Sequence, residues 1–201
     1  MKKFPIILLT LYIIYFIVLA INPYDRAVWF AENLPIVLIV LGIVWIHIKK
    51  HKFSNLSLIL MAFLVFMHTT GGHFTFERVP FDFITNLFNF ERNHFDRIAH
   101  FSVGFYGFAI AELMLAKKSV NSKSILFLFP IFTIFTVASV YEIIEWWYAA
   151  TAGGEQGIAF LGSQGDVWDA QKDMLADGLG AIFVMILFFV LNRDKIKKLV
   201  K

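Results

Sequence analysis

Six long apolar runs dominate this sequence and restrict what it can fold into. A helix needs about 20 mostly apolar residues to cross the hydrocarbon core of a bilayer, and six segments meet or approach that length. They cover residues 4–21, 29–48, 53–71, 98–116, 124–149 and 174–192. The sequence therefore predicts an all-α, polytopic membrane helix bundle with six transmembrane helices.

The composition excludes the main alternatives to a membrane protein. Hydrophobic residues make up 59% of the chain and charged residues 16%, against about 45–50% and about 25% in ordinary globular proteins. Intrinsic disorder requires low hydrophobicity. The chain has no cysteine, which excludes disulfides, thiolate metal sites and cysteine nucleophiles. Because no repeat, linker or low-complexity tract divides it, we expect residues 1–201 to form a single membrane domain.

The basic residues predict how the bundle is oriented. Alternating the six spans puts 13 of the 18 Lys and Arg residues on one side, which is cytoplasmic by the positive-inside rule. Both termini are then cytoplasmic, and the long loops 72–97 and 150–173 lie outside. We therefore expect a multi-pass protein of the bacterial cytoplasmic (inner) membrane. The first 20 residues also resemble a signal peptide, but their apolar run is long for one, so we expect this span to be retained.

The same pattern defines the expected partners. The lipid bilayer is one partner, and a basic stripe that could follow the phosphates of a nucleic acid is missing from the sequence. The outer loops favour an envelope or lipid-linked substrate. The oligomeric state does not follow from the sequence.

Ionisable residues occur at one depth in four different predicted helices. His68, His100, Glu142 and Asp177 each lie 16 to 19 residues from the basic flank of their helix. At about 1.5 Å per residue this places them about 24–29 Å from the cytoplasmic boundary. Because carboxylates face lipid only at a cost of a few kcal/mol, we expect these side chains to point into the bundle. They predict an acidic, His-containing pocket at the extracytoplasmic face.

Helical spacing adds carboxylates to this cluster. Asp169, Asp173 and Asp177 recur every four residues and share one helix face, while Glu142 and Glu145 share another. Like charges stacked in this way repel each other. Bound cations, shared protons or neighbouring arginines must therefore neutralise them.

Further polar residues surround these helices. Asp96 precedes His100 by one helical turn, the spacing at which a carboxylate can orient an imidazole. The adjoining loops supply residues that we expect to support the cluster or bind substrate: His73, Glu77, Arg92, His94, Arg97, Asp166 and Asp169.

Three interpretations of the cluster remain open. The first is a divalent metal ion of unspecified identity, whose ligands would be His100, Glu142, Asp173 and Asp177. With Glu145 as the base and Asp96 as a second catalytic residue, the protein would be an enzyme of metal-assisted hydrolysis or group transfer on an envelope substrate. The second is a proton- or cation-coupled transporter of a small solute. The third is a structural or partner-binding protein whose polar network closes the bundle.

Four sequence blocks carry a resemblance to a known family. They cover residues 71–77, 92–101, 141–147 and 162–174, with the sequences GGHFTFE, RNHFDRIAHF, YEIIEWW and GSQGDVWDAQKDM. In these blocks the chain resembles the YjdF type of bacterial inner-membrane proteins. The resemblance implies an inner-membrane protein and carries no reaction.

More distantly, the same blocks resemble the VanZ superfamily. Its pattern is an acid-base pair followed by His-Phe, a Glu with a Gln three residues later, and an Asp followed by Asn and Gly. Asp96-Arg97 with His100-Phe101 matches the first part of that pattern. Glu145 stands where Gln is usual and Asp177 where Asn is usual, and both departures add acid. The resemblance implies a cell-envelope context, and the added acid favours a cation or proton site.

Overall fold

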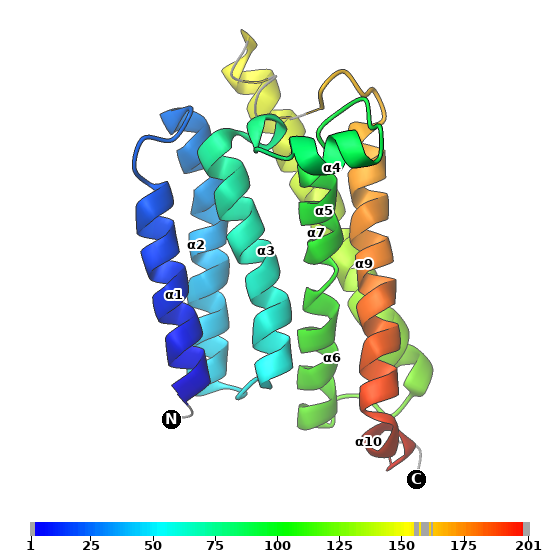
Figure 1. Ribbon diagram of the computed structural model, residues 1–201. Helices are drawn as coiled ribbons and strands as arrows, with labels where there is room; N and C mark the ends of the chain where they lie inside the picture. The colour runs from blue at the N-terminus through cyan, green and yellow to red at the C-terminus, as the bar shows by residue number, and fades with distance from the viewer. Residues whose placement is uncertain (1–2, 155–156, 158–160, 162, 199–201) are drawn as a thin grey trace.

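The protein forms a bundle of helices that stand side by side (Figure 1). The computed structural model describes residues 3–154, 157, 161 and 163–198. The long elements are α1 (Lys3–Leu19), α2 (Arg26–Lys49), α3 (Asn55–Phe74), α5 (Phe95–Val103), α6 (Tyr106–Lys117), α7 (Lys123–Ala152) and α9 (Asp169–Leu191). The short elements are η1 (Phe76–Arg78), α4 (Asp82–Leu87) and α10 (Arg193–Lys197). All regular structure in the described residues is helical, as the sequence predicts.

Five segments are long and apolar enough to cross a membrane. They are α2, α3, the stretch Phe95–Lys117 that joins α5 and α6, α7 and α9. The first helix, α1, is apolar but has only 17 residues. The fold is therefore a polytopic helical membrane bundle with five candidate spans and one shorter apolar helix.

Side-chain caps explain where three of the long helices begin. The Asp25 carboxylate accepts hydrogen bonds from the backbone N–H groups of Ala27 and Val28 at the start of α2. Ser54 and Ser122 cap α3 and α7 in the same way. Such residues satisfy N–H groups that a helix leaves unpaired in its first turn.

The predicted span 98–116 is not one continuous helix. Its helical hydrogen bonding is interrupted at Gly104 and Phe105, between α5 and α6. A Cβ atom on Gly104 would lie 2.1 Å from the backbone nitrogen of Ala181, and one on Gly180 would lie 1.9 Å from the Phe101 carbonyl oxygen. The two glycines therefore let the α5–α6 junction and α9 touch backbone to backbone, as small residues do in membrane bundles.

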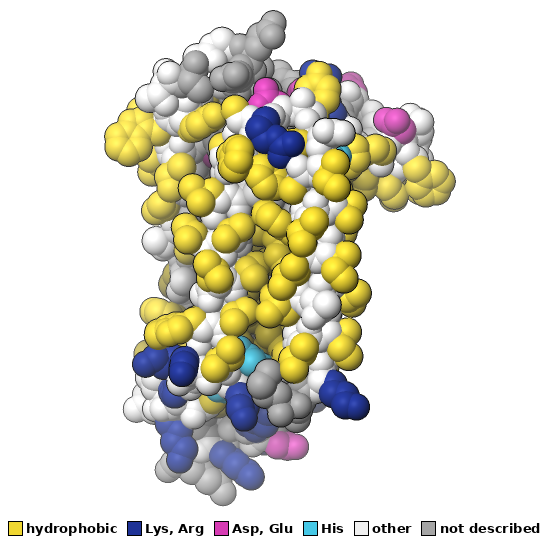
Figure 2. Space-filling model, turned by 90° about the vertical axis from the view of Figure 1, so that its left-hand side faces the viewer, with side chains coloured by type: hydrophobic (Ala, Val, Ile, Leu, Met, Phe, Trp, Pro, Cys, Tyr) yellow, Lys and Arg dark blue, Asp and Glu magenta, His cyan; other side chains and the backbone are white. Residues whose placement is uncertain are grey.

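Apolar side chains fill the interior and also cover the outside. Phe108, Leu126, Met185 and Phe188 form part of the buried cluster between α6, α7 and α9. Figure 2 shows a broad hydrophobic band on the surface between two ends that carry Lys and Arg. A surface of this kind is compatible with lipid and not with water.

An aromatic segment follows α3 on the acidic end of the bundle, the end that carries the loops 72–97 and 150–173. It contains α4, in which Phe83 is 77% exposed, followed by Phe88 at 60%. Exposed aromatic residues at a helix-bundle end are typical of a segment that lies in the membrane interface.

Candidate functional site

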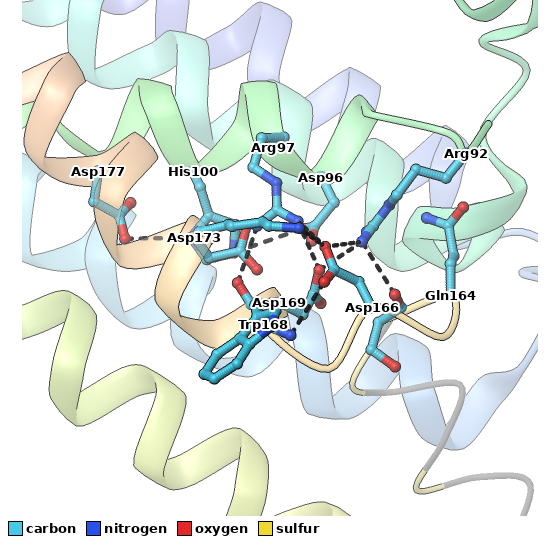
Figure 3. A network of polar contacts seen from close by, with 12 residues as sticks. Arg92, Asp96, Arg97, His100, Gln164, Asp166, Trp168, Asp169, Asp173 and Asp177 are labelled. Atoms are coloured by element: carbon cyan, nitrogen blue, oxygen red, sulfur yellow. Dashed lines mark hydrogen bonds and ion pairs between the residues drawn. The ribbon is translucent and has the colours of Figure 1, made fainter. Parts of the chain in front are cut away.

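His100 lies at the centre of a group of carboxylates from α5 and α9 (Figure 3). Its Nδ1 is 3.3 Å from Oδ2 of Asp177. Its Nε2 is 3.6 Å from Oδ1 of Asp96 and 3.8 Å from Oδ1 of Asp173. Nδ1 thus faces one carboxylate, and Nε2 faces two.

The carboxylates around His100 are shielded from solvent. Asp96, Asp173 and Asp177 are all buried, and Asp177 is only 1% exposed. The four-residue spacing on α9 puts Asp169, Asp173 and Asp177 on its buried face. Asp96, His100 and Asp173 each offer one potential ligand atom, and these three atoms lie within 4.8 Å of one another.

Two arginines neutralise part of this negative charge. The Arg97 guanidinium pairs with Asp173 through Nη1, and its Nη2 lies 2.7 Å from Oδ1 of Asp169. Arg92 reaches the same Asp169 oxygen at 2.7 Å. Because Arg97 belongs to α5 and Arg92 to the loop before it, these pairs bind α5 and its preceding loop to α9.

The loop that leads into α9 is held by further polar contacts. Arg92 Nη1 donates to the Ser163 carbonyl oxygen at 3.0 Å, and the amide of Gln164 exchanges two hydrogen bonds of 3.0 Å with the backbone of Asn93. Lys172 donates to Asp166 at 2.6 Å. This hydrogen bond lowers the pKa of Asp166 below its usual value.

Charge also affects the histidine beside this loop. The pKa of His94 is lowered, first because partial burial disfavours the imidazolium, and also because Arg92 and Arg97 are positive. Its ring lies against Phe90, with the ring centroids 4.6 Å apart.

A small cavity adjoins the cluster inside the bundle. Its volume is about 110 Å³, space for a few water molecules at about 30 Å³ each. Four carboxylates and two histidines contribute to its wall: Glu32, His68, Asp96, His100, Glu145 and Asp177. Five helices thus bring ionisable groups to the wall of one cavity.

Glu32 is the cavity residue that sequence analysis missed. It is 2% exposed, its Oε2 lies 3.0 Å from Nε2 of His68, and Tyr141 donates to the same oxygen at 3.4 Å. The sequence did hold a signal, because Glu32 is the only charged residue in the apolar run 29–48. Its place near the start of that run made it resemble a residue of the outer loop.

The structure separates the predicted site residues into groups. Asp96, His100, Asp173 and Asp177 come together, and Glu145 lines the adjoining cavity. Arg92, Arg97, Asp166 and Asp169 form the ion-pair network beside them. Glu142 lies outside the three-residue set, and its Oε1 is buried without a hydrogen-bond partner among the described residues.

Two of the predicted supporting residues have their partners elsewhere. His73 contacts the Leu19 carbonyl oxygen through Nδ1 at 2.8 Å, which joins the ends of α1 and α3. Glu77 pairs with its neighbour Arg78 at 3.3 Å. Neither side chain therefore belongs to the His100 cluster, although both residues lie in the block 71–77.

Comparison with known proteins identifies the family. A family model described as "Predicted membrane protein (DUF2238)" matches residues 4–194. The chain belongs to this family. A DUF2238 family match of this length covers every helix that carries a cluster residue, so the cluster lies within the family domain.

A relative supports the same assignment. The inner membrane protein YjdF of Escherichia coli (strain K12) is 30% identical over 184 residues, which are 89% of this chain and 84% of that protein. No solved structure matches the chain. This DUF2238 protein is thus a YjdF-type, multi-pass inner-membrane protein, as its sequence blocks predict. Neither match names VanZ, so that resemblance remains a prediction.

Proposed function

We propose that this protein binds a divalent metal ion through Asp96, His100 and Asp173 and uses it for hydrolysis or group transfer on a cell-envelope substrate. The observation that carries the proposal is the geometry of His100. Its Nε2 faces the oxygens of Asp96 and Asp173, while its Nδ1 faces Asp177. A histidine that ligates a metal commonly gives its second ring nitrogen to a carboxylate in this way.

The separations of His100 Nε2 from the two carboxylate oxygens support a metal ion, and the same Asp173 oxygen also pairs with Arg97. At 3.6 and 3.8 Å, the contacts of Nε2 are too long for hydrogen bonds. A tetrahedron with metal–ligand bonds of about 2.1 Å has edges of about 3.4 Å. One imidazole and two carboxylates are a donor set that borderline divalent ions accept.

This proposal changes three roles that the sequence suggested. Glu142, predicted as a ligand, lies outside the proposed ligand set. Asp177 becomes the residue that orients His100, where the sequence predicted a ligand. Asp96 becomes a ligand, where the sequence predicted a catalytic residue. Asp96 reaches Nε2 because it precedes His100 by one turn of α5, and the packing of α5 against α9 brings Asp177 to Nδ1.

The neighbouring residues have distinct proposed roles. Glu145 lines the cavity beside Asp96 and His100 and is placed to act as the general base. A divalent ion would supply Lewis acidity and activate water. Arg97 and Arg92 hold α5 and the loop before it against α9, which fixes the ligands.

The orientation of the bundle completes the proposal. Counting α1 as a sixth span puts both termini on the side that carries 13 of the 18 basic residues. That side has a net charge of +11 and the other side −8. The positive-inside rule then makes the basic end cytoplasmic, and the His100 cluster faces the cell envelope.

Metal analysis of the purified protein tests this function. We expect about one divalent ion per chain in the parent, and a loss of that ion in His100→Gln and Asp96→Asn variants. Glu77→Gln is the matched control, because it removes an acid from the same end of the bundle outside the cluster. A parent without stoichiometric metal after growth and purification without chelator would refute the proposal.

Melting temperatures separate this proposal from a structural network. If the cluster only holds the bundle together, His100→Gln should lower the melting temperature by the same amount whether or not metal is present. If it binds metal, added metal should raise the melting temperature of the parent and leave that of the variant unchanged, since a ligand stabilises only the state that binds it.

One observation favours a second candidate function, proton- or cation-coupled transport of a small solute. The pair of Glu32 and His68 extends the ionisable wall of the cavity to α2 and α3. Intramembrane carboxylates and histidines are typical parts of ion pathways. A Glu32→Gln variant should then abolish pH-dependent uptake or efflux in reconstituted vesicles, and transport that this change leaves unaffected would exclude the candidate.

A further inference from the structure

A second and much larger cavity lies at the opposite, basic end of the bundle. Its volume is about 1430 Å³. Residues from α1, α2, α3, α6, α9 and α10 and from the loops 50–54 and 118–122 line it. It is therefore separate from the His100 cluster, which lies near the other ends of α5 and α9.

Positive charge dominates the wall of this cavity. Lys52, Lys118, Lys195 and Lys198 line it, together with two histidines. In the described part of the chain, none of these four lysines lies within 4.0 Å of a carboxylate. Figure 2 shows Lys and Arg side chains gathered at this end. The cavity thus offers positive charge that the protein itself does not neutralise.

Among the described residues of the wall, the one acidic residue is Glu112, and its carboxylate already has hydrogen-bond partners. The Glu112 carboxylate accepts hydrogen bonds from the backbone N–H and the hydroxyl of Ser54 at 2.8 and 2.6 Å, and also from the Ser57 hydroxyl. His51 Nε2 lies 2.9 Å from the same carboxylate. Glu112 therefore fixes the start of α3 and leaves the lysines available to an external anion.

Apolar side chains form the other part of the wall. Phe53, Leu56, Phe108, Leu115 and Phe188 line the cavity beside the lysines. A cavity with a positive side and an apolar side fits an amphiphile that carries a negative charge next to hydrocarbon. Its place at the end of a lipid-facing bundle gives it access to the headgroup layer of one leaflet.

We propose that this cavity binds the phosphate headgroup of an anionic lipid. Basic pockets between transmembrane helices on the cytoplasmic side are a recurring means of binding such headgroups. The lysines pair with the phosphate, and the apolar residues contact the start of the acyl chains. A role in orienting the bundle requires only that the lysines lie on the cytoplasmic side. It does not explain why they line one cavity together with aromatic rings.

Native mass spectrometry of the full chain tests the proposal with phosphatidylglycerol and phosphatidylcholine of the same acyl chains. The test variant combines Lys52→Gln, Lys118→Gln and Lys195→Gln. The control variant combines Lys49→Gln, Lys123→Gln and Lys197→Gln, which removes the same charge from the same end at exposed positions outside the cavity wall. All six side chains are exposed, so both variants keep the core intact.

We expect the parent and the control variant to retain phosphatidylglycerol over phosphatidylcholine, and the cavity variant to bind phosphatidylglycerol about tenfold to a hundredfold more weakly. An equal loss in both variants would show diffuse surface electrostatics and overturn the proposal. Equal retention of the two lipids by the parent would overturn it as well. A separate arm adds inorganic phosphate: displacement of bound lipid by millimolar phosphate would identify the ligand as the free anion and not the lipid.

Discussion

A Gly180→Ala substitution should separate α5 from α9 and disturb the His100 cluster at a distance. The added Cβ atom would lie 1.9 Å from the Phe101 carbonyl oxygen and 2.9 Å from its carbonyl carbon. Non-bonded carbon atoms prefer a separation of about 3.5–4.0 Å, so the two backbones must move apart by more than an ångström. No side-chain rotation can relieve the contact, because the opposing atoms belong to the backbone.

The magnitude follows from the cost of overpacking a core. Inserting one extra methyl group into a close-packed site costs about 1–3 kcal/mol, and for a chain of this length each kcal/mol lowers the melting temperature by about 2–4 °C. We therefore expect a decrease of about 2–12 °C in detergent. Because Phe101 adjoins His100, the shift should also lengthen the contacts of His100 with α9 and reduce metal retention.

Two other glycines provide matched controls in the same assay. A Cβ on Gly107 would meet its nearest neighbour at 3.7 Å, an ordinary contact, and one on Gly42 would meet nothing within 4 Å. Thermal unfolding of Gly107→Ala and Gly42→Ala should thus occur at the melting temperature of the parent or slightly above it, because Ala favours a helix more than Gly. If Gly180→Ala unfolds at the same temperature as these two variants, the α5–α6 junction and α9 do not make the close backbone contact on which this prediction rests.

Three further predictions concern the ion pairs and the basic end. Arg97→Gln leaves the buried Asp173 carboxylate without its arginine, while Asp169 keeps Arg92, and should lower the free energy of unfolding by about 3–5 kcal/mol. Arg78→Gln, whose side chain is 51% exposed, should change it by less than about 1 kcal/mol, and similar melting temperatures would contradict this difference. Lys172 lowers the pKa of Asp166, so the stability from this pair is present above the usual Asp pKa and is lost as the pH falls through the lower, folded-state pKa. The melting temperatures of the parent and Asp166→Asn should therefore converge at the acid end of a pH series. A difference that stays constant down to the lowest pH would contradict the pairing. Glu112→Gln removes a charged acceptor of several hydrogen bonds at the start of α3 and should cost about 1–3 kcal/mol, without changing metal content at the other end.

The sequence predicted the helices well because hydrophobic length is a local property. All six predicted runs correspond to helices, and the boundaries differ by a few residues, for example 174–192 against Asp169–Leu191 for α9. The interruption at Gly104 escaped prediction because its cause is a contact with α9. Gly104 is 76 residues from Gly180 in the chain, and only the fold reveals that their backbones meet.

The sequence predicted which residues form the candidate site better than it predicted how they are arranged. Helical spacing and depth brought His100 together with Asp173 and Asp177, since both depend only on the rise of a helix and the position of its basic flank. The sequence could not tell which ring nitrogen faces which carboxylate, because that depends on how α5 rotates against α9. Glu32 was missed for a related reason: its role depends on His68, a partner on another helix.

The unequal lengths of the helices have a consequence for the surrounding lipid. At about 1.5 Å per residue, the 17 residues of α1 span about 26 Å and the 30 residues of α7 about 45 Å. The hydrocarbon layer is about 30 Å thick, and Figure 1 shows α7 running obliquely behind the other helices. Tilt absorbs the excess length of α7, whereas a helix that is too short is accommodated by local thinning of the bilayer or by flanking residues that snorkel to the interface. If α1 crosses the membrane as the sequence predicts, we expect the bilayer to thin beside it, so that the annulus of lipid around this protein is asymmetric and enriched in short acyl chains on the α1 side.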